Sequence, residues 1–434
     1  MQSLLPLLLF SSTTLRWIER KGRCMRKSNI AAVLTSFVLV ASSLMSVTPS
    51  GAVGTKLYSG KEWKKILSEA KGQTVNWYMW GGGAKINTYV NDYLGEEAKK
   101  YGITLNQVKL NATPEAVNKV LGEKQAGNDK NGSVDLIWIN GNNFATGVQA
   151  DIWHCDWSTK LPNTKYVNWN SSAVNQDFGL PVNGCESPWA TASSGVVYDS
   201  KYVKKSDLAS AAAFTAWVKK NPGKFTYPAP PDFNGSMTVR RFFYQANGGY
   251  NQFLGKFDQA KFDSAMNKTA SFLNEIEPYL WRKGATYPAT IGDVQKLFAT
   301  GEISAYLDYG ARNAFVEVNN GLYPDSTRVG VFGDGMIGNL SYVTIPYNSP
   351  RKAGAQVIAN LMLAPQAQMK LQTDGIVGLP AINMNITPIS GPYRSLPISK
   401  HSLSPTKLAK KANPEISADW VNAIDSAWKD KVQK

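Results

Sequence analysis

The sequence contains few of the residues on which metal and nucleophilic chemistry depend. Only two of its 434 residues are histidines, His154 and His401, and three are cysteines. Zinc sites usually draw on several His and Cys ligands, and a Ser-His-Asp triad needs a histidine beside an acid and a nucleophile. The composition therefore argues against a histidine-rich zinc site and against triad chemistry. We expect no metal, no cofactor and no catalytic residues.

The chain also lacks blocks of charge of one sign, although its formal net charge is +15. The first 52 residues carry six basic groups and one acid, which leaves 15 − 5 = +10 for the remaining chain. The lysines are dispersed, and neither a Lys/Arg block nor a nucleic-acid-binding motif is present. We therefore expect no nucleic-acid partner.

Long hydrophobic runs are missing after the first fifty residues, and the run near the N-terminus is short. Met25-Arg26-Lys27 is basic, residues 30–45 are apolar but serine-rich, and Ser50-Gly51-Ala52 offers a small-residue cleavage site. We interpret residues 1–52 as a secretory signal region that is cleaved near Ala52, with a membrane anchor as the alternative. Met25, which precedes a complete signal, is a candidate start of translation.

Export would leave two cysteines, Cys155 and Cys185, in an oxidising compartment, where such a pair usually forms a disulfide. A metal site and a catalytic thiol are the alternatives. A metal would need more ligands than His154, the only histidine nearby, can add. We favour the disulfide.

Strand and helix patterns alternate in the first part of the exported chain, which is typical of a parallel sheet. The predicted strands cover residues 74–79, 103–110 and 134–139, and the predicted helices cover 86–101 and 114–125. Such sheets bind ligands beyond the carboxyl ends of their strands. Glycine-rich and asparagine-rich loops, residues 80–83 and 140–143, follow the first and third strands.

A second unit follows, and the chain then returns to the first. Its predicted elements are helices over residues 209–219, 238–246 and 262–280, a strand over 225–227 and a helix-to-strand step over 297–307. We expect the first lobe to contain residues 53–198 and 331–390, and the second lobe residues 199–330. An amphipathic helix in the tail, residues 391–434, is expected to pack on a lobe.

The segment from Asn339 to Gln368 combines a strand, a proline stop, a polar turn and an amphipathic helix that ends at LAPQAQ. This order resembles the last domain crossover of bacterial extracytoplasmic solute-binding proteins, which feed ABC importers. The tracts at 134–147, 177–200 and 224–249 look like the same family, in a poorly characterised branch linked to thiamine- or polyamine-type importers. The resemblance covers about Gln73 to Gln368.

The resemblance implies an α/β, two-lobed periplasmic-binding-protein-like fold (type II), hinged by two crossover strands. It also implies a function without catalysis. The protein would be a monomeric periplasmic receptor that captures a small organic solute in the cleft between its lobes and delivers it to ABC permease subunits in the membrane.

Candidate ligand contacts in the first lobe follow the predicted strands. Trp80 offers a ring for stacking, and Gly81 and Gly82 offer backbone N–H groups to an anion or a carbonyl, although three glycines also make an ordinary tight turn. Asn140 and Asn143 offer amides to a neutral solute. Trp189, on the presumed first hinge strand, is our preferred aromatic contact, with packing within the hinge as the alternative.

Candidate contacts in the second lobe are Asn234, Ser236, Asp308 and Tyr309. Asn234 or Ser236 would also serve as a helix N-cap. A carboxylate beside a phenol suits an amine or a cationic ring, whereas Arg240 and Arg312 favour an anionic group. The charge of the ligand therefore stays open.

A secreted carbohydrate-active protein is the alternative function. The chain has thirteen tryptophans, and two carboxyl groups that converge on one bond would allow glycoside hydrolysis. The candidate acids are Asp151, Glu186, Asp232 and Asp308. Turnover of a glycoside would favour this alternative, whereas recovery of an unchanged bound ligand would favour the receptor.

Processing of the N-terminus gives the first prediction. If residues 1–52 are a cleaved signal, N-terminal sequencing of the exported protein will begin near Val53. Retention of Met1 or Met25 in the exported protein would contradict this interpretation.

Overall fold

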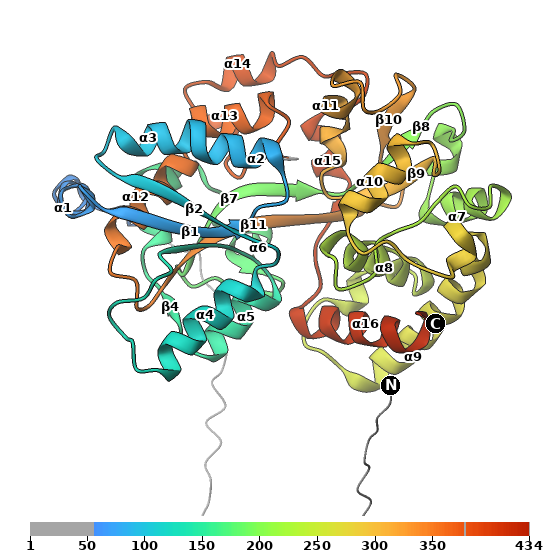
Figure 1. The fold of residues 1–434 in the computed structure, drawn as a ribbon, viewed down its shortest axis with the longest axis horizontal. Coiled ribbons are helices and arrows are strands. Elements are labelled where there is room, and N and C mark those ends of the chain that lie inside the picture. The colour runs from blue at the N-terminus through green and yellow to red at the C-terminus, as the bar shows by residue number, and fades with distance from the viewer. Residues whose placement is uncertain (1–55, 377–378, 434) are drawn as a thin grey trace, which may run out of the picture. The chain divides into compact units, whose positions relative to one another are not determined.

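The computed structural model describes residues 56–376 and 379–433, so the predicted signal region lies outside the described residues. These residues form two α/β lobes with separate hydrophobic cores (Figure 1). Among the helices described, none combines the length and the apolar character required to cross a membrane.

The first lobe is built around a sheet whose centre is parallel, as the sequence predicts. Strands β1 (Thr74–Trp80), β2 (Thr104–Leu110) and β3 (Leu136–Ile139) are parallel, with β1 between the other two. The longer strand β11 (Met336–Pro346) pairs antiparallel with β3. Alternate side chains of β1 are buried, as a strand with unlike faces requires.

Helices cover both faces of this sheet, and α3 and α4 lie on opposite sides of β1 and β2 (Figure 1). A π-helical segment, Tyr89–Leu94, connects α2 to α3, so the helix expected over residues 86–101 consists of three consecutive segments. The helices of this lobe are α1 (Gly60–Ala70), α2 (Ala84–Thr88), α3 (Gly95–Lys99), α4 (Pro114–Gln125), α5 (Asn142–Gln149), α6 (Ser172–Asn175), α12 (Lys352–Met362), α13 (Pro365–Thr373) and α14 (Ser390–Arg394).

The second lobe has a three-stranded antiparallel sheet in the order β10-β8-β9. Aromatic rings dominate its core, and Phe225 contributes only an isolated bridge to Ala305 where a strand was expected over residues 225–227. The elements of this lobe are β8 (Gly195–Asp199), β9 (Ala305–Asp308), β10 (Thr327–Gly330), α7 (Ala211–Lys220), α8 (Phe233–Ala246), α9 (Gln259–Ile276), α10 (Ile291–Ala299) and α11 (Ala314–Asn319).

Two antiparallel strands cross between the lobes. Strand β7 (Glu186–Ser193) pairs with β11 over most of its length. The start of β11, Met336 and Ile337, lies in the core of the second lobe, whereas Tyr342 and Val343 lie in the core of the first. One strand therefore belongs to both cores, which is the arrangement of a two-lobed protein hinged by crossover strands.

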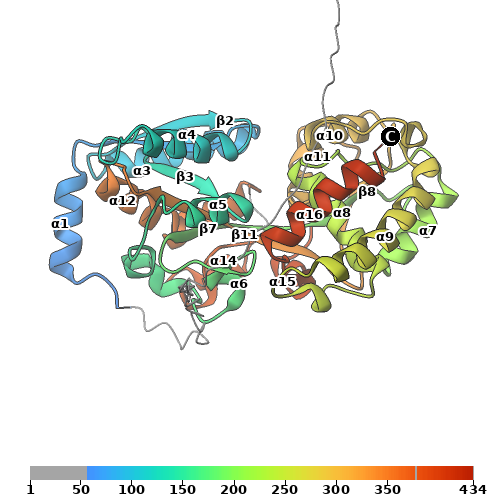
Figure 2. The ribbon, with the colours of Figure 1, turned by 90° about the horizontal axis from the view of Figure 1, so that it is seen from below.

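The C-terminal segment packs mainly on the second lobe. Strand β12 (Ala412–Asn413) pairs with the start of β11, and helix α16 (Ala418–Lys431) follows α15 (Pro405–Lys410). Trp420 and Trp428 of α16 are buried in the second core, and Figure 2 shows α16 beside α8 and α9. The assignment of residues 53–198 and 331–390 to one lobe and 199–330 to the other stays a prediction. Tyr198, Met336 and Ile337 all lie in the second core.

The disulfide between Cys155 and Cys185 is present. Cys155 directly follows β4 (Trp153–His154), which pairs with the end of β11, and Cys185 directly precedes β7. The bond therefore fastens the first-lobe end of the hinge strand to its neighbour. Among the described residues, no group of three or more His, Cys, Asp or Glu residues is arranged to hold a metal ion.

The loop that the Cys155–Cys185 disulfide closes gives the second prediction. The bonded cysteines are 30 residues apart in sequence, so the chain-entropy model predicts that the bond contributes roughly 3 to 4 kcal/mol to the free energy of unfolding. Thiol labelling of denatured, unreduced exported protein should find no free thiol, and the double variant Cys155→Ala/Cys185→Ala should unfold at lower urea concentration. Two reactive thiols in the parent protein would contradict the pairing.

Candidate functional site: the cleft between the lobes

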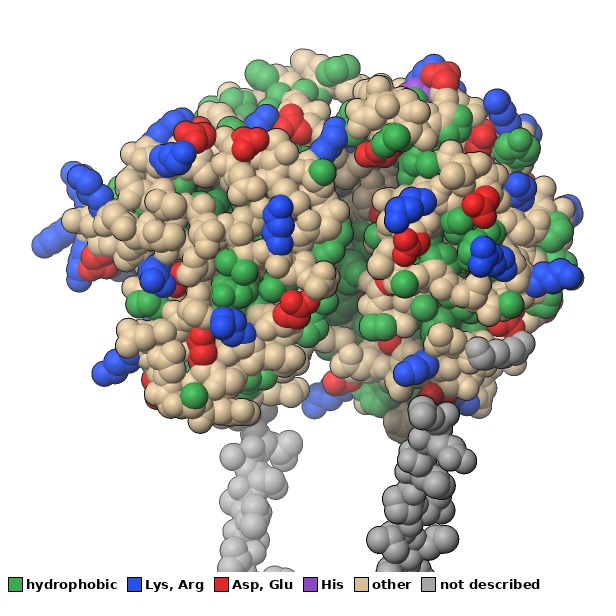
Figure 3. Space-filling view, viewed as in Figure 1, with side chains coloured by type: hydrophobic (Ala, Val, Ile, Leu, Met, Phe, Trp, Pro, Cys, Tyr) green, Lys and Arg blue, Asp and Glu red, His purple; other side chains and the backbone are tan. Residues whose placement is uncertain are grey.

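A hollow separates the two lobes in the space-filling view, and hydrophobic side chains are visible in its depth (Figure 3). Several of the predicted contact residues lie at strand ends in both lobes. In the first lobe they lie at the carboxyl ends of β1 and β3, and in the second lobe they lie at the end of β9. Trp80 and Asn140 follow this rule in the first lobe, and Asp308 and Tyr309 follow it in the second.

Four tryptophans form a ladder from the surface of the first lobe into its core. Trp80 is 39% exposed and packs edge-on against Trp138, with 6.4 Å between ring centroids. Trp138 meets Trp189 at 4.9 Å, and Trp189 meets Trp77 at 5.4 Å, both nearly perpendicular. Such edge-to-face pairs are favourable beyond the area that they bury. The ladder holds the exposed Trp80 ring on a rigid base.

The glycines after Trp80 make room for its ring. A Cβ on Gly82 would lie 2.3 Å from the indole of Trp80, and a Cβ on Gly81 would lie 2.6 Å from the Lys109 side chain. Any larger residue at Gly82 would therefore displace the ring. The structure gives the Trp80–Gly83 turn this packing role, while contact of Gly81 and Gly82 with a solute stays a prediction.

Trp189 occupies a different position from the one expected of an aromatic contact. Its side chain has no exposed surface and packs between Trp138 and Trp77. The alternative, packing within the hinge, describes this geometry. Replacement of a fully buried tryptophan by alanine costs about 3 to 5 kcal/mol, so Trp189→Ala would report on stability rather than on ligand contact.

Asn140 is engaged with the hinge. Its amide Nδ2 donates to Oδ1 of Asn339 on β11 at 3.0 Å, and the Nδ2 of Asn339 is buried without a partner among the described residues. Asn143, in the first turn of α5, is half-buried. Next to it, the Asn142 amide donates to Asn422 of α16, so the C-terminal helix touches the first lobe at this point.

Asp308 and Tyr309 are nearly buried at the end of β9. Asp308 accepts hydrogen bonds from the Gln295 amide at 3.0 Å and from the Gly310 backbone at 2.6 Å. Burial raises the pKa of its carboxyl to about 6. The Tyr309 ring stacks on Phe233 at 4.8 Å, and Phe233 is the ring of this pair that reaches solvent.

The cap of helix α8 differs from the prediction. Asp232, rather than Asn234 or Ser236, is the N-cap, since its Oδ1 accepts from the backbone N–H groups of Asn234 and Gly235. Its Oδ2 accepts from the N–H of Ile291 at the start of α10. The Asn234 side chain does not cap the helix, and its Oδ1 instead accepts a hydrogen bond from the Tyr309 N–H at 2.8 Å.

Ser236 and Tyr309 belong to a buried polar network that the sequence patterns did not reveal. The Arg240 guanidinium donates two 3.0 Å bonds to the Glu415 carboxylate, and Tyr309 also donates to Glu415. Ser236 donates to Asp425 of α16 at 2.7 Å. Burial alone would lower the pKa of Arg240, but the charge of Glu415 raises it, so Arg240 stays charged.

Two buried acids lie in the first lobe near the hinge. Asp177 accepts from the backbone N–H of Gly141, and burial raises the pKa of its carboxyl to about 8. Glu186, at the start of β7, is fully buried. Burial raises the pKa of its carboxyl well above the ordinary value, and the charge of the nearby Asp177 adds a smaller rise. A carboxyl in such a site is favoured in its neutral, protonated form.

The acids considered for glycoside hydrolysis have other surroundings. Glu186 is sealed from solvent, and both oxygens of Asp232 accept backbone N–H groups. Asp151 is exposed on the loop after α5. Among the candidate contacts and the rings that pack on them, the exposed aromatic rings are Trp80 in the first lobe and Phe233 in the second.

Comparison with known proteins connects this geometry to a family. The family described as bacterial extracellular solute-binding protein matches residues 88–387. Protein YnjB of Escherichia coli strain K12 is 32% identical over 370 residues, which cover 85% of this chain and 93% of that protein.

Solved structures share the fold at lower sequence identity. An ABC transporter substrate-binding protein from Bradyrhizobium japonicum is 18% identical, with a TM-score of 0.59, and covers 83% of this chain and 100% of its own. The spermidine/putrescine ABC transporter substrate-binding protein PotD from Streptococcus pneumoniae is 13% identical, with a TM-score of 0.59, and covers 82% and 98%. These likenesses support the two-lobed fold.

The raised pKa of Asp177 gives the third prediction. The unfolded chain ionises Asp177 near its ordinary pKa of 3.8, whereas the folded chain does so near 8. The contribution of Asp177 to the free energy of unfolding is therefore fully present below the unfolded pKa. It is lost as the pH rises through the folded pKa. Asp177→Asn, which stays neutral, should reduce the fall in unfolding free energy between about pH 5 and pH 8.

Urea denaturation at both pH values measures this difference. The matched control is Asp92→Asn, because Asp92 is exposed, and this variant should keep the pH dependence of the parent. An unchanged slope in Asp177→Asn would show that Asp177 ionises normally in the folded protein.

Proposed function

Because the chain belongs to the bacterial extracellular solute-binding protein family, we propose that it acts as a periplasmic receptor without catalytic activity. It captures a small organic solute between its lobes and delivers the solute to the membrane subunits of an ABC importer. The family assignment supports solute binding and transport, and the proposal adds the compartment, the permease partner and the monomeric state.

The observation that carries the proposal is the β7–β11 crossover. Two cores that share one strand pair can rotate about it while each stays intact. A solute held between the lobes then contacts both and stabilises the closed arrangement by its differential affinity.

We assign the solute contacts to side chains on both lobes. Trp80 and Phe233 provide exposed rings, and Trp138 supports Trp80 from behind. Trp138 and Phe233 were missed in the sequence, although Trp138 lies near the carboxyl end of β3, next to β1 in the sheet. Further proposed contacts are Gly81, Gly82, Asn140, Asn143, Asn234, Ser236, Asp308 and Tyr309, with Trp189 as support for the ladder.

The periplasmic location is supported by two features. The N-terminal sequence has the three regions of a secretory signal, and the disulfide between Cys155 and Cys185 is of a kind that persists in oxidising compartments. We infer cleavage near Ala52.

Native mass spectrometry of exported protein, purified without denaturation, tests the function. The expected result is a complex with a single co-purified small molecule, which is recovered chemically unchanged after release. Conversion of the released molecule by fresh protein would contradict a receptor and favour an enzyme.

The assignment of Trp80 gives the fourth prediction. At a hundredfold excess over Kd, the recovered solute should stabilise the parent by about 2.7 kcal/mol. Trp80→Ala should weaken solute affinity by about tenfold, because stacking of a solute group on the ring is lost. Asp308→Ala should likewise reduce the ligand-induced rise in Tm.

Tyr101→Ala is the matched control, since Tyr101 is a similarly exposed ring at the end of α3. This variant should bind like the parent, and the ligand-free Tm of Trp80→Ala should stay close to that of the parent. If both Trp80→Ala and Asp308→Ala bind like the parent, the proposed site is wrong even where solute binding itself is established.

A further inference from the structure

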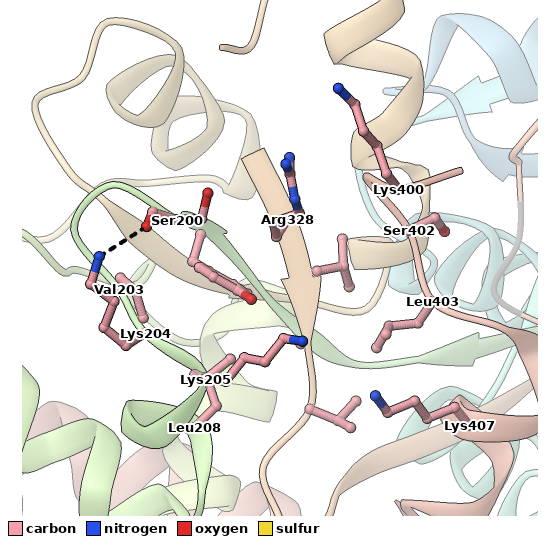
Figure 4. Close-up of a pocket in the computed structure, with 14 residues that line it drawn as sticks. Ser200, Val203, Lys204, Lys205, Leu208, Arg328, Lys400, Ser402, Leu403 and Lys407 are labelled. Atoms are coloured by element: carbon pink, nitrogen blue, oxygen red, sulfur yellow. Dashed lines mark hydrogen bonds between the residues drawn. The ribbon is translucent and has the colours of Figure 1, made fainter. Parts of the chain in front are cut away.

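The second lobe contains a pocket on the side of its sheet away from Asp308. The pocket lies at β10, the edge strand opposite β9, and three chain segments form its walls: residues 198–208, 328–331 and 400–407 (Figure 4). Its volume of about 560 Å³ is that of a small-molecule site. None of the contacts proposed for the cleft lines it.

The lining of this pocket is cationic. Five of the residues that line it are basic and none is acidic. The basic residues are Lys204, Lys205, Arg328, Lys400 and Lys407. A concave surface with charges of one sign concentrates ions of the opposite sign.

Three of these cations have protein partners. Lys400 pairs with Asp325 at 2.9 Å, the Lys204 ammonium lies 3.4 Å from the carbonyl oxygens of Ser200 and Lys201, and Arg328 donates to the Thr327 carbonyl at 2.7 Å. These bonds hold the rim of the pocket in place.

Lys205 and Lys407 differ from the other three. Neither side-chain ammonium group makes a hydrogen bond or an ion pair among the described residues, and Figure 4 shows these two groups directed toward each other from opposite walls. Two like charges that face each other repel, and an anion placed between them turns that repulsion into two attractions.

The walls of the pocket are fixed by buried bonds. Ser402 donates to the Arg312 carbonyl at 2.9 Å, and His401 is bonded to the Thr327 carbonyl at 2.8 Å, so the tail segment is fastened to the second lobe on the pocket's side. Val203, Leu208 and Leu403 add apolar surface to the lining. The pocket thus combines a fixed shape, a partly apolar lining and two unpaired cations.

We propose that this pocket is a second ligand site, which binds a small multivalent anion of the phosphate class between Lys205 and Lys407. Ammonium groups bind phosphate oxygens as point charges through charge-assisted hydrogen bonds, and a phosphate group carries enough charge and acceptors for both lysines. Free inorganic phosphates and organic phosphomonoesters share this chemistry. The apolar part of the lining would accept the organic part of the latter.

Isothermal titration calorimetry tests the site. The exported protein is titrated with pyrophosphate and with phenyl phosphate at a constant ionic strength of about 0.1 M. The expected result is saturable binding with one ligand per chain. Lys205→Gln/Lys407→Gln should weaken this binding by about tenfold or more, whereas Lys205→Arg/Lys407→Arg, which keeps both charges, should retain it. Tighter binding of phenyl phosphate than of pyrophosphate would show that the apolar part of the lining contacts the organic group of the ligand.

The matched control is Lys256→Gln/Lys268→Gln. Both lysines are exposed in the same lobe, and their side chains have no hydrogen bond or ion pair among the described residues, so this variant changes the net charge equally. It should bind like the parent. Three results would overturn the proposal: no saturable binding, equal weakening in the control, or unchanged binding in Lys205→Gln/Lys407→Gln.

Discussion

Strand β11 is the constraint on which the rest of the structure depends. It is 11 residues long, and its two ends are buried in different cores. A slip of one residue against β7 would move each side chain of the strand to the opposite face of the sheet, so both cores hold its register. The pairing with β7 is interrupted between Ser341 and Tyr342. Irregularities of this kind bend a strand locally.

The buried network around Arg240 adds a second constraint, which acts on the tail. Arg240 and Glu415 are almost fully buried and form two hydrogen bonds, and Tyr309 joins them from the end of β9. A buried ion pair contributes little net stability, because desolvation offsets the attraction, yet it strongly disfavours any arrangement that separates the partners. The network therefore determines where the tail lies on the second lobe more than how stable the lobe is.

The fold could be predicted because its signals are local and repeated. Alternating strand and helix patterns, turn residues and the tract from Asn339 to Gln368 all point to one topology, and neighbouring segments agree with each other. The surroundings of the candidate site residues could not be predicted in the same way, because they depend on contacts distant in sequence. Trp189 carries the same local signal as an exposed contact, and only the neighbouring Trp77 and Trp138 bury it. Asp232 is the cap of α8 because a single side chain reaches two helix starts, which spacing alone does not show. Glu415, separated from Arg240 by 175 residues, has no local signal for its partner.

Helix α16 offers a position from which a motion of one lobe relative to the other could be followed by spectroscopy. The helix is buried in the second core, but its first turns lie beside α5 of the first lobe. Both cysteines in the described part of the chain are bonded to each other, so one cysteine introduced at the exposed Asp419 would be the only free thiol there. A fluorophore attached at that position would report any change in the distance between α16 and α5, so the protein can be made into its own optical reporter.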